Sequence, residues 1–509
     1  MRATQPRAAQ PRAGQPRAAR RVPPPRGPIP RSQESDLALR LLDRVAREAI
    51  ASCGAEDAVR RTCLARTGKV SLAGRPVPVD GAGKILVLAY GKAALGMSRA
   101  LVRRINEAGG KRPVAGLVVV PVGTGTGWPF GDAPRSRFRL TVVEGDHPVP
   151  GRLSFAAGRR ALQIAARAGR GDDLVYLASG GGSAMLAAPL PRLMTPAGKV
   201  GVHRALIASG APIAAINVVR KHLSGIKGGR LAVAAQRARS QMTLMVCDVD
   251  LDRAADVASG PSLPDRTTVD DMVRIIDRYG VAPQVPSPVL EALRVGKVPE
   301  TPKPRAPEFR RSASSVVLSN RELRNAAARA ALSRGLPAEA VPSEMTGQID
   351  MAVEMIARAI ESAPPGTRLL VLGGEVLASP NGGGTGGRAQ ELALRLALRM
   401  AGLGSRPWAF MAAGSDGVDG NSPAAGAFVD GTTLQRARAA GLDIGKILKD
   451  SDTWRLFNRL GDALVTGPTG TNVRDVYLLL TGSAAAAPRG FDPFRTTLDR
   501  PPLPEEPES

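Results

Sequence analysis

Short apolar runs recur along this chain of 509 residues, and each leads into a polar or glycine-rich turn followed by a helical pattern. Runs of this length bounded by turn signals are typical of buried strands. Strands that alternate with helices predict a mostly parallel α/β sheet. The strands we expect are Ile85–Ala89, Gly116–Val120, Leu174–Ala178, Thr243–Cys247, Val316–Ser319, Leu369–Leu372 and Trp408–Ala413.

The length allows two or three domains, and with only 3% aromatic residues the core must rest on aliphatic side chains. Pro299–Arg311 has the proline and charge content of a linker. We therefore expect a larger Rossmann-like parallel-sheet domain and a smaller α/β C-terminal domain, with the ligand site in the cleft between them. The predicted divisions are a disordered basic tail (1–35), the two domains (36–300 and 312–485) and a loose C-terminal tail (486–509).

The formal net charge of +25 includes eight arginines and no acid in residues 1–33. No basic stripe interleaved with aromatic residues accompanies this charge, so we expect no nucleic-acid partner. No apolar stretch reaches the ~18 residues of a membrane span, and no membrane partner is expected. Three cysteines provide no disulfide framework, which favours a reducing, cytoplasmic compartment.

A glycine-dense loop, Gly382–Gly387, follows one predicted strand and opens into a helix that begins at Arg388. Backbone N–H groups, a helix N-terminus and a guanidinium together suit a phosphate, with Gly386 and Gly387 nearest the helix. The carboxylate of Glu375 is expected just past the end of the strand. The alternative is a surface loop with an ordinary arginine at a helix start.

A second small-residue turn, Gly180, Gly181, Gly182 and Ser183, follows the strand at Leu174–Ala178. Consecutive small residues let backbone N–H groups converge on an anion, and the serine hydroxyl can donate one more hydrogen bond. A tight turn without a ligand is the alternative.

Basic residues also stand near predicted strand ends or on a predicted helix. Lys92 follows a strand and can balance phosphate charge as a point cation. Arg220 and Lys221 lie in a basic run, where Arg220 is suited to a bidentate carboxylate contact. A solvated helix-start lysine and a solvated basic face are the respective alternatives.

Carboxylates follow two of the strands, at Asp248 and Asp250 and at Asp416 and Asp419. Carboxylates at strand ends suit Mg²⁺, which binds through one or two of them plus phosphate oxygens. They also suit general-base action on a hydroxyl group. Turn formation is the alternative, and His147 is interpreted as a loop histidine.

Neither of two common nucleotide-binding motifs is present in the sequence context that it requires. The pattern GxxxxGK[ST] does not occur. GxGxxG occurs at Gly382, Gly384 and Gly387, but about ten residues after the strand and without the later acid that a dinucleotide fingerprint requires.

Eight ordered segments between about Leu37 and Gly482 resemble the MOFRL-type glycerate 2-kinases, a family often named hydroxypyruvate reductase. The segments are YGKAALGM (90–97), DHPVP (146–150), SGGGSAML (179–186), NVVRKHLSGIKGGRLA (217–232), ASGPSLPD (258–265), GGRAQELAL (386–394), AAGSDGVDGNSPAAGA (412–427) and LVTGPTGTNVRD (464–475).

The resemblance implies two α/β domains that phosphorylate the 2-hydroxyl of D-glycerate with ATP and Mg²⁺. It also implies that Lys92 is the essential lysine and Arg388 the essential arginine. With the placements above, the expected site residues are Lys92, Arg388 and Asp416 for catalysis; Ser183, Arg220, Lys221 and Glu375 for the substrate; Gly180, Gly181, Gly182, Gly386 and Gly387 for phosphate; and Asp416 and Asp419 for the metal.

Three positions depart from the family pattern: Ala389 replaces an asparagine beside the arginine, Asp146 a glycine and Cys247 a serine. The alternatives are therefore a hydroxypyruvate reductase that uses NAD(P)H, against which the missing fingerprint argues, and an inactive hydroxy-acid-binding protein. The expected partners are the small-molecule substrates, D-glycerate and ATP, and a homo-oligomer remains open.

Overall fold

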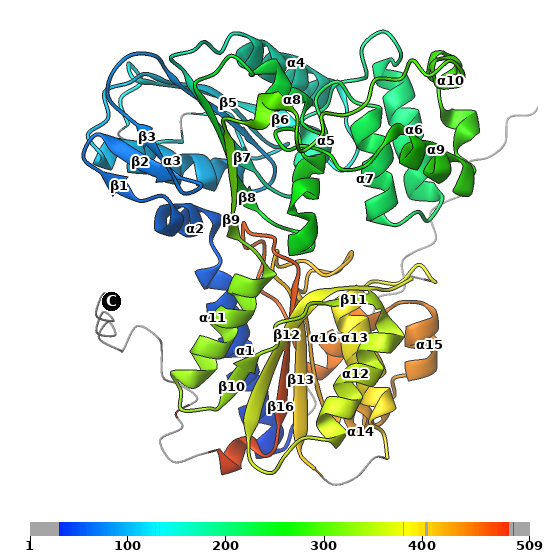
Figure 1. Cartoon of the computed structure of the whole chain (residues 1–509). Coiled ribbons are helices and arrows are strands. Elements are labelled where there is room, and N and C mark those ends of the chain that lie inside the picture. Colours follow the sequence, from blue (N-terminus) through cyan, green and yellow to red (C-terminus); the bar gives the residue numbers. More distant parts are fainter. Residues whose placement is uncertain are drawn as a thin grey trace, which may run out of the picture.

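The computed structural model describes residues 30–487 and 492, apart from residues 128, 132, 380 and 403–405. The chain forms two domains, one above the other in Figure 1, and each is built on its own central sheet. Most of the two predicted tails, 1–35 and 486–509, lies outside the described residues. Residues 30–35 belong to the fold, because Arg31 Nε donates to Asp462 Oδ1 (2.9 Å) and Ser32 caps the first helix.

The first sheet has six strands in the order β6-β5-β4-β7-β8-β9, and every neighbouring pair is parallel. This is the doubly wound order, in which the direction of winding reverses between β4 and β7. The Rossmann-like prediction for this domain is confirmed. The strands are β4 (Ile85–Tyr90), β5 (Val114–Pro121), β6 (Phe138–Gly145), β7 (Asp173–Ala178), β8 (Ser240–Val246) and β9 (Ser312–Leu318).

Helices cover both faces of this sheet, and all six residues of β4 and of β7 are buried. Complete burial explains why these strands are continuous apolar runs rather than alternating ones. The helices of this domain are α2 (Ala55–Thr62), α3 (Ala94–Glu107), α4 (Arg152–Ala166), α5 (Gly182–Met185), α6 (Pro196–Ala208), α7 (Ile213–His222), α8 (Arg230–Ala234), α9 (Val269–Arg278) and α10 (Ser287–Arg294). A small antiparallel sheet joins β1 (Ala65–Arg66), β2 (Lys69–Leu72) and β3 (Arg75–Pro78).

Four of these helices, α6, α7, α9 and α10, form a separate cluster at the upper right of Figure 1. They enclose an apolar core of their own, which includes Leu206, Val219, Met272 and Val289. Of these helices, the sequence predicted only the one that carries the basic run with Arg220 and Lys221. This cluster matters for the site because it carries Arg220.

The second sheet has the order β10-β12-β16-β13-β14-β15, with β11 also paired to β12. Only the pairs of β12 with β10 and β11 are parallel; the other pairs are antiparallel, so this domain differs from the mostly parallel pattern expected. The strands are β10 (Ala338–Ala340), β11 (Met345–Gln348), β12 (Arg368–Leu377), β13 (Trp408–Gly414), β14 (Gly426–Asp430), β15 (Ala463–Leu464) and β16 (Asp475–Thr481). Because β16 comes from the end of the chain, its place between β12 and β13 is not visible in local sequence.

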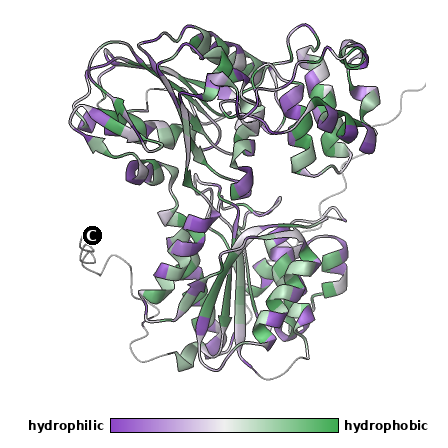
Figure 2. Cartoon of the chain, in the orientation of Figure 1, coloured by the Kyte–Doolittle hydropathy of each residue, from purple (hydrophilic) through white to green (hydrophobic). Residues whose placement is uncertain are grey.

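Helices pack on both faces of the second sheet, with α1 and α11 on one face and α12 and α13 on the other. Figure 2 shows that the strands are largely hydrophobic and that hydrophilic residues gather on outer helix surfaces. The helices are α1 (Gln33–Ser52), α11 (Asn320–Leu332), α12 (Ile349–Glu361), α13 (Arg388–Arg399), α14 (Thr433–Ala439), α15 (Ile444–Lys449) and α16 (Thr453–Leu460). In the part of the chain that is described, no helix is long and apolar enough to cross a membrane.

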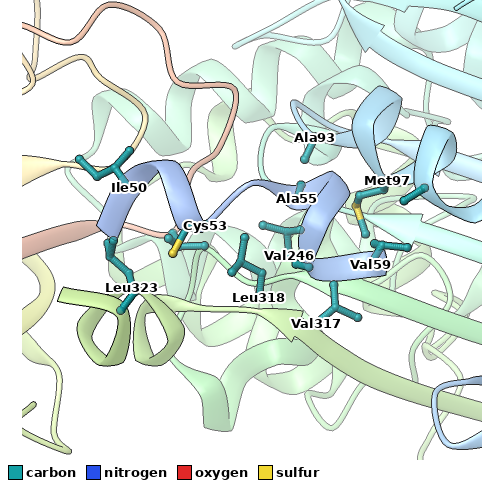
Figure 3. Packing of buried hydrophobic residues seen from close by; sticks show 14 of the residues in the cluster. Ile50, Cys53, Ala55, Val59, Ala93, Met97, Val246, Val317, Leu318 and Leu323 are labelled. Atoms are coloured by element: carbon teal, nitrogen blue, oxygen red, sulfur yellow. The ribbon is translucent and has the colours of Figure 1, made fainter. Parts of the chain in front are cut away.

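Two segments lie in the other domain from the one expected. Helix α1 packs against α11 and the second sheet, whereas β9 is the last strand of the first sheet. The chain therefore crosses between the domains twice, after α1 and after β9. Figure 3 shows the two crossings side by side, with Cys53 and Ala55 of one near Leu318 and Leu323 of the other in a shared apolar core. The segment 299–311, which was predicted to link the two domains, instead lies within the first domain, because it precedes β9.

Candidate active site

The point where winding reverses in the first sheet lies between the ends of β4 and β7, and two predicted motifs meet there. The N–H of Lys92 donates to the carbonyl of Gly180 (2.9 Å), and Ala93 N–H donates to Ser179 Oγ (3.0 Å). Gly91 has φ +114°, and a Cβ there would lie 2.4 Å from Ser179 Oγ, so only glycine fits. In open α/β sheets ligands bind at this crevice.

Lys92 also reaches the second domain. Its Nζ lies 3.8 Å from Asp416 Oδ2, and the two side chains are 40% and 30% exposed. Asp416 follows β13 and lines a cavity of about 680 Å³, together with Glu375, Arg388 and the glycine loop. The structure therefore brings two of the three predicted catalytic residues together where the domains meet.

Arg388, the third, is the first residue of α13 and contacts two carboxylates. Its Nε and Nη2 donate to the two oxygens of Asp475 (2.8 and 3.0 Å), and its Nη1 donates to Glu375. Although burial alone would lower it, the charge of Asp475 holds the Arg388 pKa above its ordinary value. The guanidinium faces the cavity with its charge already balanced.

Glu375 lies within β12, not past its end as expected, because the strand extends to Leu377. Its Oε2 lies 3.6 Å from Arg474 Nε, so both of its oxygens face arginines. Glu375 also lines the large cavity, so its predicted contact with substrate stays a prediction.

Arg474 was not predicted as a site residue, although it lies in the segment 464–475 that resembles the family. It joins the two domains, since Nη1 donates to Asp250 Oδ1 and Glu344 Oε2 (2.7 Å each) and Nε donates to the carbonyl of Asp248 (3.1 Å). Its φ of +68° is in the left-handed region, where non-glycine residues are uncommon. Such strain next to a cleft is a signal of function that only coordinates reveal.

Asp419 lines the large cavity, and its carboxyl group also contacts the start of α13. Its two oxygens accept the backbone N–H groups of Ala389 (3.0 Å) and Gln390 (2.9 Å), the first turn of α13. Burial raises the pKa of this carboxyl to about 6, against the opposing effect of those hydrogen bonds. The N-terminus of α13 does bind an anion, as predicted, but the anion is the protein's own Asp419.

Two N–H groups of the glycine loop likewise donate to acceptors within the protein. Gly384 N–H donates to the carbonyl of Asp450 (2.9 Å), and Gly386 N–H donates to Asn421 Oδ1 (2.8 Å). A Cβ on Gly387 would lie 2.2 Å from Asp419 Oδ1. Gly386 and Gly387 therefore pack closely against neighbouring segments while lining the large cavity, and their predicted phosphate contact stays a prediction. Ala389 is fully buried beside them, so a side chain there does not face the cavity.

The turn at 180–183 is close-packed as well. A Cβ on Gly180 would lie 2.4 Å from Asp248 Oδ2, and one on Gly181 would lie 3.3 Å from His147 Nε2. Burial, and then the charge of Lys92, lower the pKa of His147, so this ring is neutral at pH 7. Burial raises the pKa of Asp248 to about 6. The turn thus places a neutral histidine and a carboxyl group of raised pKa near Lys92.

The two basic residues of α7 have different surroundings. Lys221 Nζ pairs with Asp256 Oδ1 (2.5 Å) and Asp265 Oδ1 (3.1 Å), which leaves it engaged in the fold rather than in the predicted substrate contact. Arg220 borders a second, small cavity of about 20 Å³ that Ser183 also lines. Ser183 Oγ lies 2.8 Å from Ser259 Oγ.

Among the described residues, no group of three or more His, Cys, Asp or Glu side chains is arranged to hold a metal ion. A Mg²⁺ ion that phosphate oxygens share needs only one or two carboxylates. Asp416 fits that requirement, since it lines the large cavity and is partly exposed. Asp419 lines the same cavity, but both of its oxygens already accept N–H groups of α13, and its predicted role as a metal ligand stays a prediction.

Two family models match the chain: a domain of unknown function, DUF4147, over residues 41–294, and the MOFRL family over residues 368–475. The glycerate 2-kinase of Pyrococcus horikoshii is 32% identical over 86% of this chain and 96% of its own. An Agrobacterium vitis protein with the provisional name hydroxypyruvate reductase is 37% identical over 80% of this chain and 89% of its own.

A solved structure extends the likeness to the fold. The crystal structure of glycerate kinase from Thermotoga maritima matches with a TM-score of 0.71 at 30% identity, over 88% of this chain and all of that one. The relatives span both domains and the cleft between them. The chain therefore belongs to the family of MOFRL-type glycerate 2-kinases.

Proposed function

We propose that this protein is a glycerate 2-kinase, which transfers the terminal phosphoryl group of ATP to the 2-hydroxyl of D-glycerate. The contact of Lys92 Nζ with Asp416 Oδ2 carries the proposal, because it joins the crevice of the first sheet to the large cavity of the second domain. A cavity of about 680 Å³ is within the usual range for a ligand such as a nucleotide.

Phosphoryl transfer depends on positioning and on charge neutralisation more than on covalent chemistry of the protein. We assign Lys92 to the charge of the transferred group, since its ammonium is partly exposed at the domain boundary. Asp416 is the carboxylate placed to hold Mg²⁺ or to accept the proton of the hydroxyl group. Mg²⁺, when bound, would neutralise phosphate charge.

Arg388 is also assigned to stabilise the charge of the transferred phosphoryl group. Unlike Lys92, it is held in a fixed orientation by carboxylates. Asp475 and Glu375 fix the plane of its guanidinium, so any hydrogen bond to phosphate would form without reorganisation of the side chain. Asp248 is a further candidate for the base, because burial raises its pKa to about 6 beside the 180–183 turn.

The acceptor is assigned to the first domain, with its carboxylate toward Ser183 and Arg220 and its 2-hydroxyl toward Lys92. Ser183 lies in the turn whose Gly180 carbonyl accepts the Lys92 N–H, so this turn links the small cavity to Lys92. Reduction of hydroxypyruvate is the weaker candidate. The GxGxxG stretch packs against residues 450–453 and does not form the first turn after β4.

One assay separates the candidates. Purified protein with ATP, Mg²⁺ and D-glycerate should produce ADP and 2-phosphoglycerate, resolved from 3-phosphoglycerate by a coupled enzyme specific for the 2-isomer. Absence of any phosphorylated product would reject the kinase. Oxidation of NAD(P)H by hydroxypyruvate under the same conditions would favour the reductase, and D-glycerate binding without either reaction would favour an inactive binding protein.

A further inference from the structure

The small cavity beside Ser183 is bordered by an unusual set of side chains, here called the basic cluster: Lys199, His203, Arg220 and Lys227. The cluster comes from α6, α7 and the turn before α8. Lys199 is 7% exposed and Lys227 is 1% exposed. Two buried lysine amino groups and a half-buried guanidinium therefore share one site. Burial lowers the pKa of both lysines, that of Lys199 to about 7.

None of the three cations forms a salt bridge with a carboxylate among the described residues. Lys221 provides a contrast, since it is as buried as Lys199 and Lys227 and pairs with both Asp256 and Asp265. Buried charges are costly unless they are paired. The basic cluster therefore lacks the carboxylate partners that the fold supplies to Lys221, and a negatively charged ligand would favour the protonated form of its lysines.

The cations differ in how fully their donors are used. Lys227 Nζ donates to three carbonyls, of Ser183 (2.7 Å), Leu186 (3.3 Å) and Ala258 (3.4 Å), and so holds the 183–186 segment in place. The hydrogen bond found for Lys199 Nζ is to the carbonyl of Leu223 (2.9 Å). An ammonium has three donors, so Lys199 has capacity for a ligand.

His203 orients Arg220 without adding a carboxylate. Arg220 Nε donates to His203 Nδ1 (3.1 Å), which requires that this nitrogen be unprotonated. Burial, and then the charge of Arg220, lower the pKa of His203 to about 3, so the ring stays neutral. A neutral acceptor behind the guanidinium fixes its direction and leaves its charge unbalanced.

We propose that Lys199 and Arg220 bind the carboxylate of the 2-hydroxy-acid substrate, with His203 as a positioning residue for Arg220. The cavity of about 20 Å³ has room for one oxygen atom, so one carboxylate oxygen would enter it and the remainder of the acid would extend past Ser183 toward Lys92. This inference rests on the proposed function and adds Lys199 and His203 to the acceptor site.

Lys199→Met is the first test, because methionine fills similar space without the charge. We expect the KM for D-glycerate to rise about 100-fold, with the KM for ATP unchanged and kcat within a few-fold of wild type. The melting temperature should not fall, since an unpaired buried charge is removed. Exposed Lys297→Met is the control and should change none of these values.

His203 is tested by rescue. His203→Leu should raise the KM for D-glycerate about tenfold, because the guanidinium loses its acceptor. His203→Gln retains a hydrogen-bond acceptor and should recover most of that loss. A purely structural role would instead lower the melting temperature of both variants and leave their KM for D-glycerate at the wild-type value.

Binding without turnover provides a readout that does not depend on the kinase reaction. D-Glycerate alone should raise the melting temperature of the wild type but not of Lys199→Met, and glycerol, which lacks the carboxylate, should raise neither. If Lys199→Met loses thermal stability and keeps its KM for D-glycerate, the lysine only anchors Leu223 and the inference is wrong while the kinase stands. If the wild type phosphorylates nothing, the same thermal shifts still decide whether the cluster binds a carboxylate.

Discussion

The basic cluster of the first domain and the N-terminus of α13 in the second are both places where the sequence predicts an anion. At α13, Asp419 accepts the N–H groups of the first turn, and Arg388 is paired with Asp475 and Glu375. In the basic cluster, Lys199, Arg220 and Lys227 have no carboxylate partner among the described residues. At α13 each of these groups has a partner of opposite charge or polarity within the protein, whereas the basic cluster lacks carboxylate partners.

The difference shows that a motif with the donors for an anion does not by itself establish a ligand-binding site. Glycines before a helix create donors, but a nearby carboxylate satisfies them as well as a phosphate would. The free energy that a fold loses by leaving buried charges unpaired is available to a ligand that pairs them. We therefore place the acceptor's negative charge in the basic cluster, and treat α13 chiefly as a rigid support for Arg388.

Lys92 lies between the two regions, and its removal should have the largest effect. Lys92→Ala should lower kcat about 100-fold or more, because charge stabilisation of the transition state is lost. Its partial exposure means that folding should be unaffected. Steady-state kinetics and thermal melting check both points, and a near-normal kcat with only a raised KM would show that Lys92 is a binding residue.

The two aspartates near α13 should separate a metal ligand from a helix cap. Asp416→Asn should raise the Mg²⁺ concentration for half-maximal activity about tenfold, since an open carboxylate is lost. Asp419→Asn should leave that concentration unchanged and lower the melting temperature by a few degrees, because a cap contributes about 1 kcal/mol. Titration of activity with Mg²⁺ measures this concentration. If only Asp419→Asn raised it, Asp419 would be the metal ligand instead of Asp416.

Removal of a cation should have opposite thermal consequences in the two regions. Arg388→Ala should lower the melting temperature by about 5 °C, because it leaves Asp475, 2% exposed, without its partner. The double variant Arg388→Ala, Asp475→Asn should recover much of the stability and none of the activity. Lys199→Met should show no loss, and equal losses at both sites would remove the contrast.

The pH dependence of stability offers the smallest but most specific comparison. Burial, followed by the charges of Arg220 and Arg230, lowers the pKa of Lys199 from 10.5 to about 7. The unfolded chain thus binds more protons than the folded one between about pH 7 and 10.5, so this group's contribution to stability rises with pH across that range.

Lys199→Met should consequently gain most over wild type below pH 7, where the lysine is charged in both states, and gain little near pH 10. The other charged or titratable groups that face Lys199 are His203 on α6, Arg220 on α7, Lys227 and Arg230. Melting curves of both proteins from pH 6 to 10 measure this difference. A gain that does not vary with pH would mean that Lys199 is not the titrating group.

Five of the six strands of the first sheet could be predicted, because buried parallel strands are continuous apolar runs bounded by glycine and polar turns. The edge strand β6 was not predicted, since its buried residues alternate with more exposed ones. The runs expected at 85–89 and 174–178 became β4 and β7 with at most one residue added at each end. The order of strands in the second sheet could not be predicted, because β16 pairs with β12 and β13 across long separations in sequence. The domains to which α1 and β9 belong could not be predicted for the same reason.

The sequence by itself determined the α/β class, the position of Lys92 after a strand, the start of α13 at Arg388 and the family, since each depends on local pattern. Only the tertiary structure decided which charges meet. Asp419 and Asp416 are three residues apart, yet one caps α13 and the other faces Lys92. Arg220 and Lys221 are adjacent, yet only Lys221 is paired with acids. Charge pairing depends on distances between segments that are remote in sequence, and the local pattern does not contain those distances.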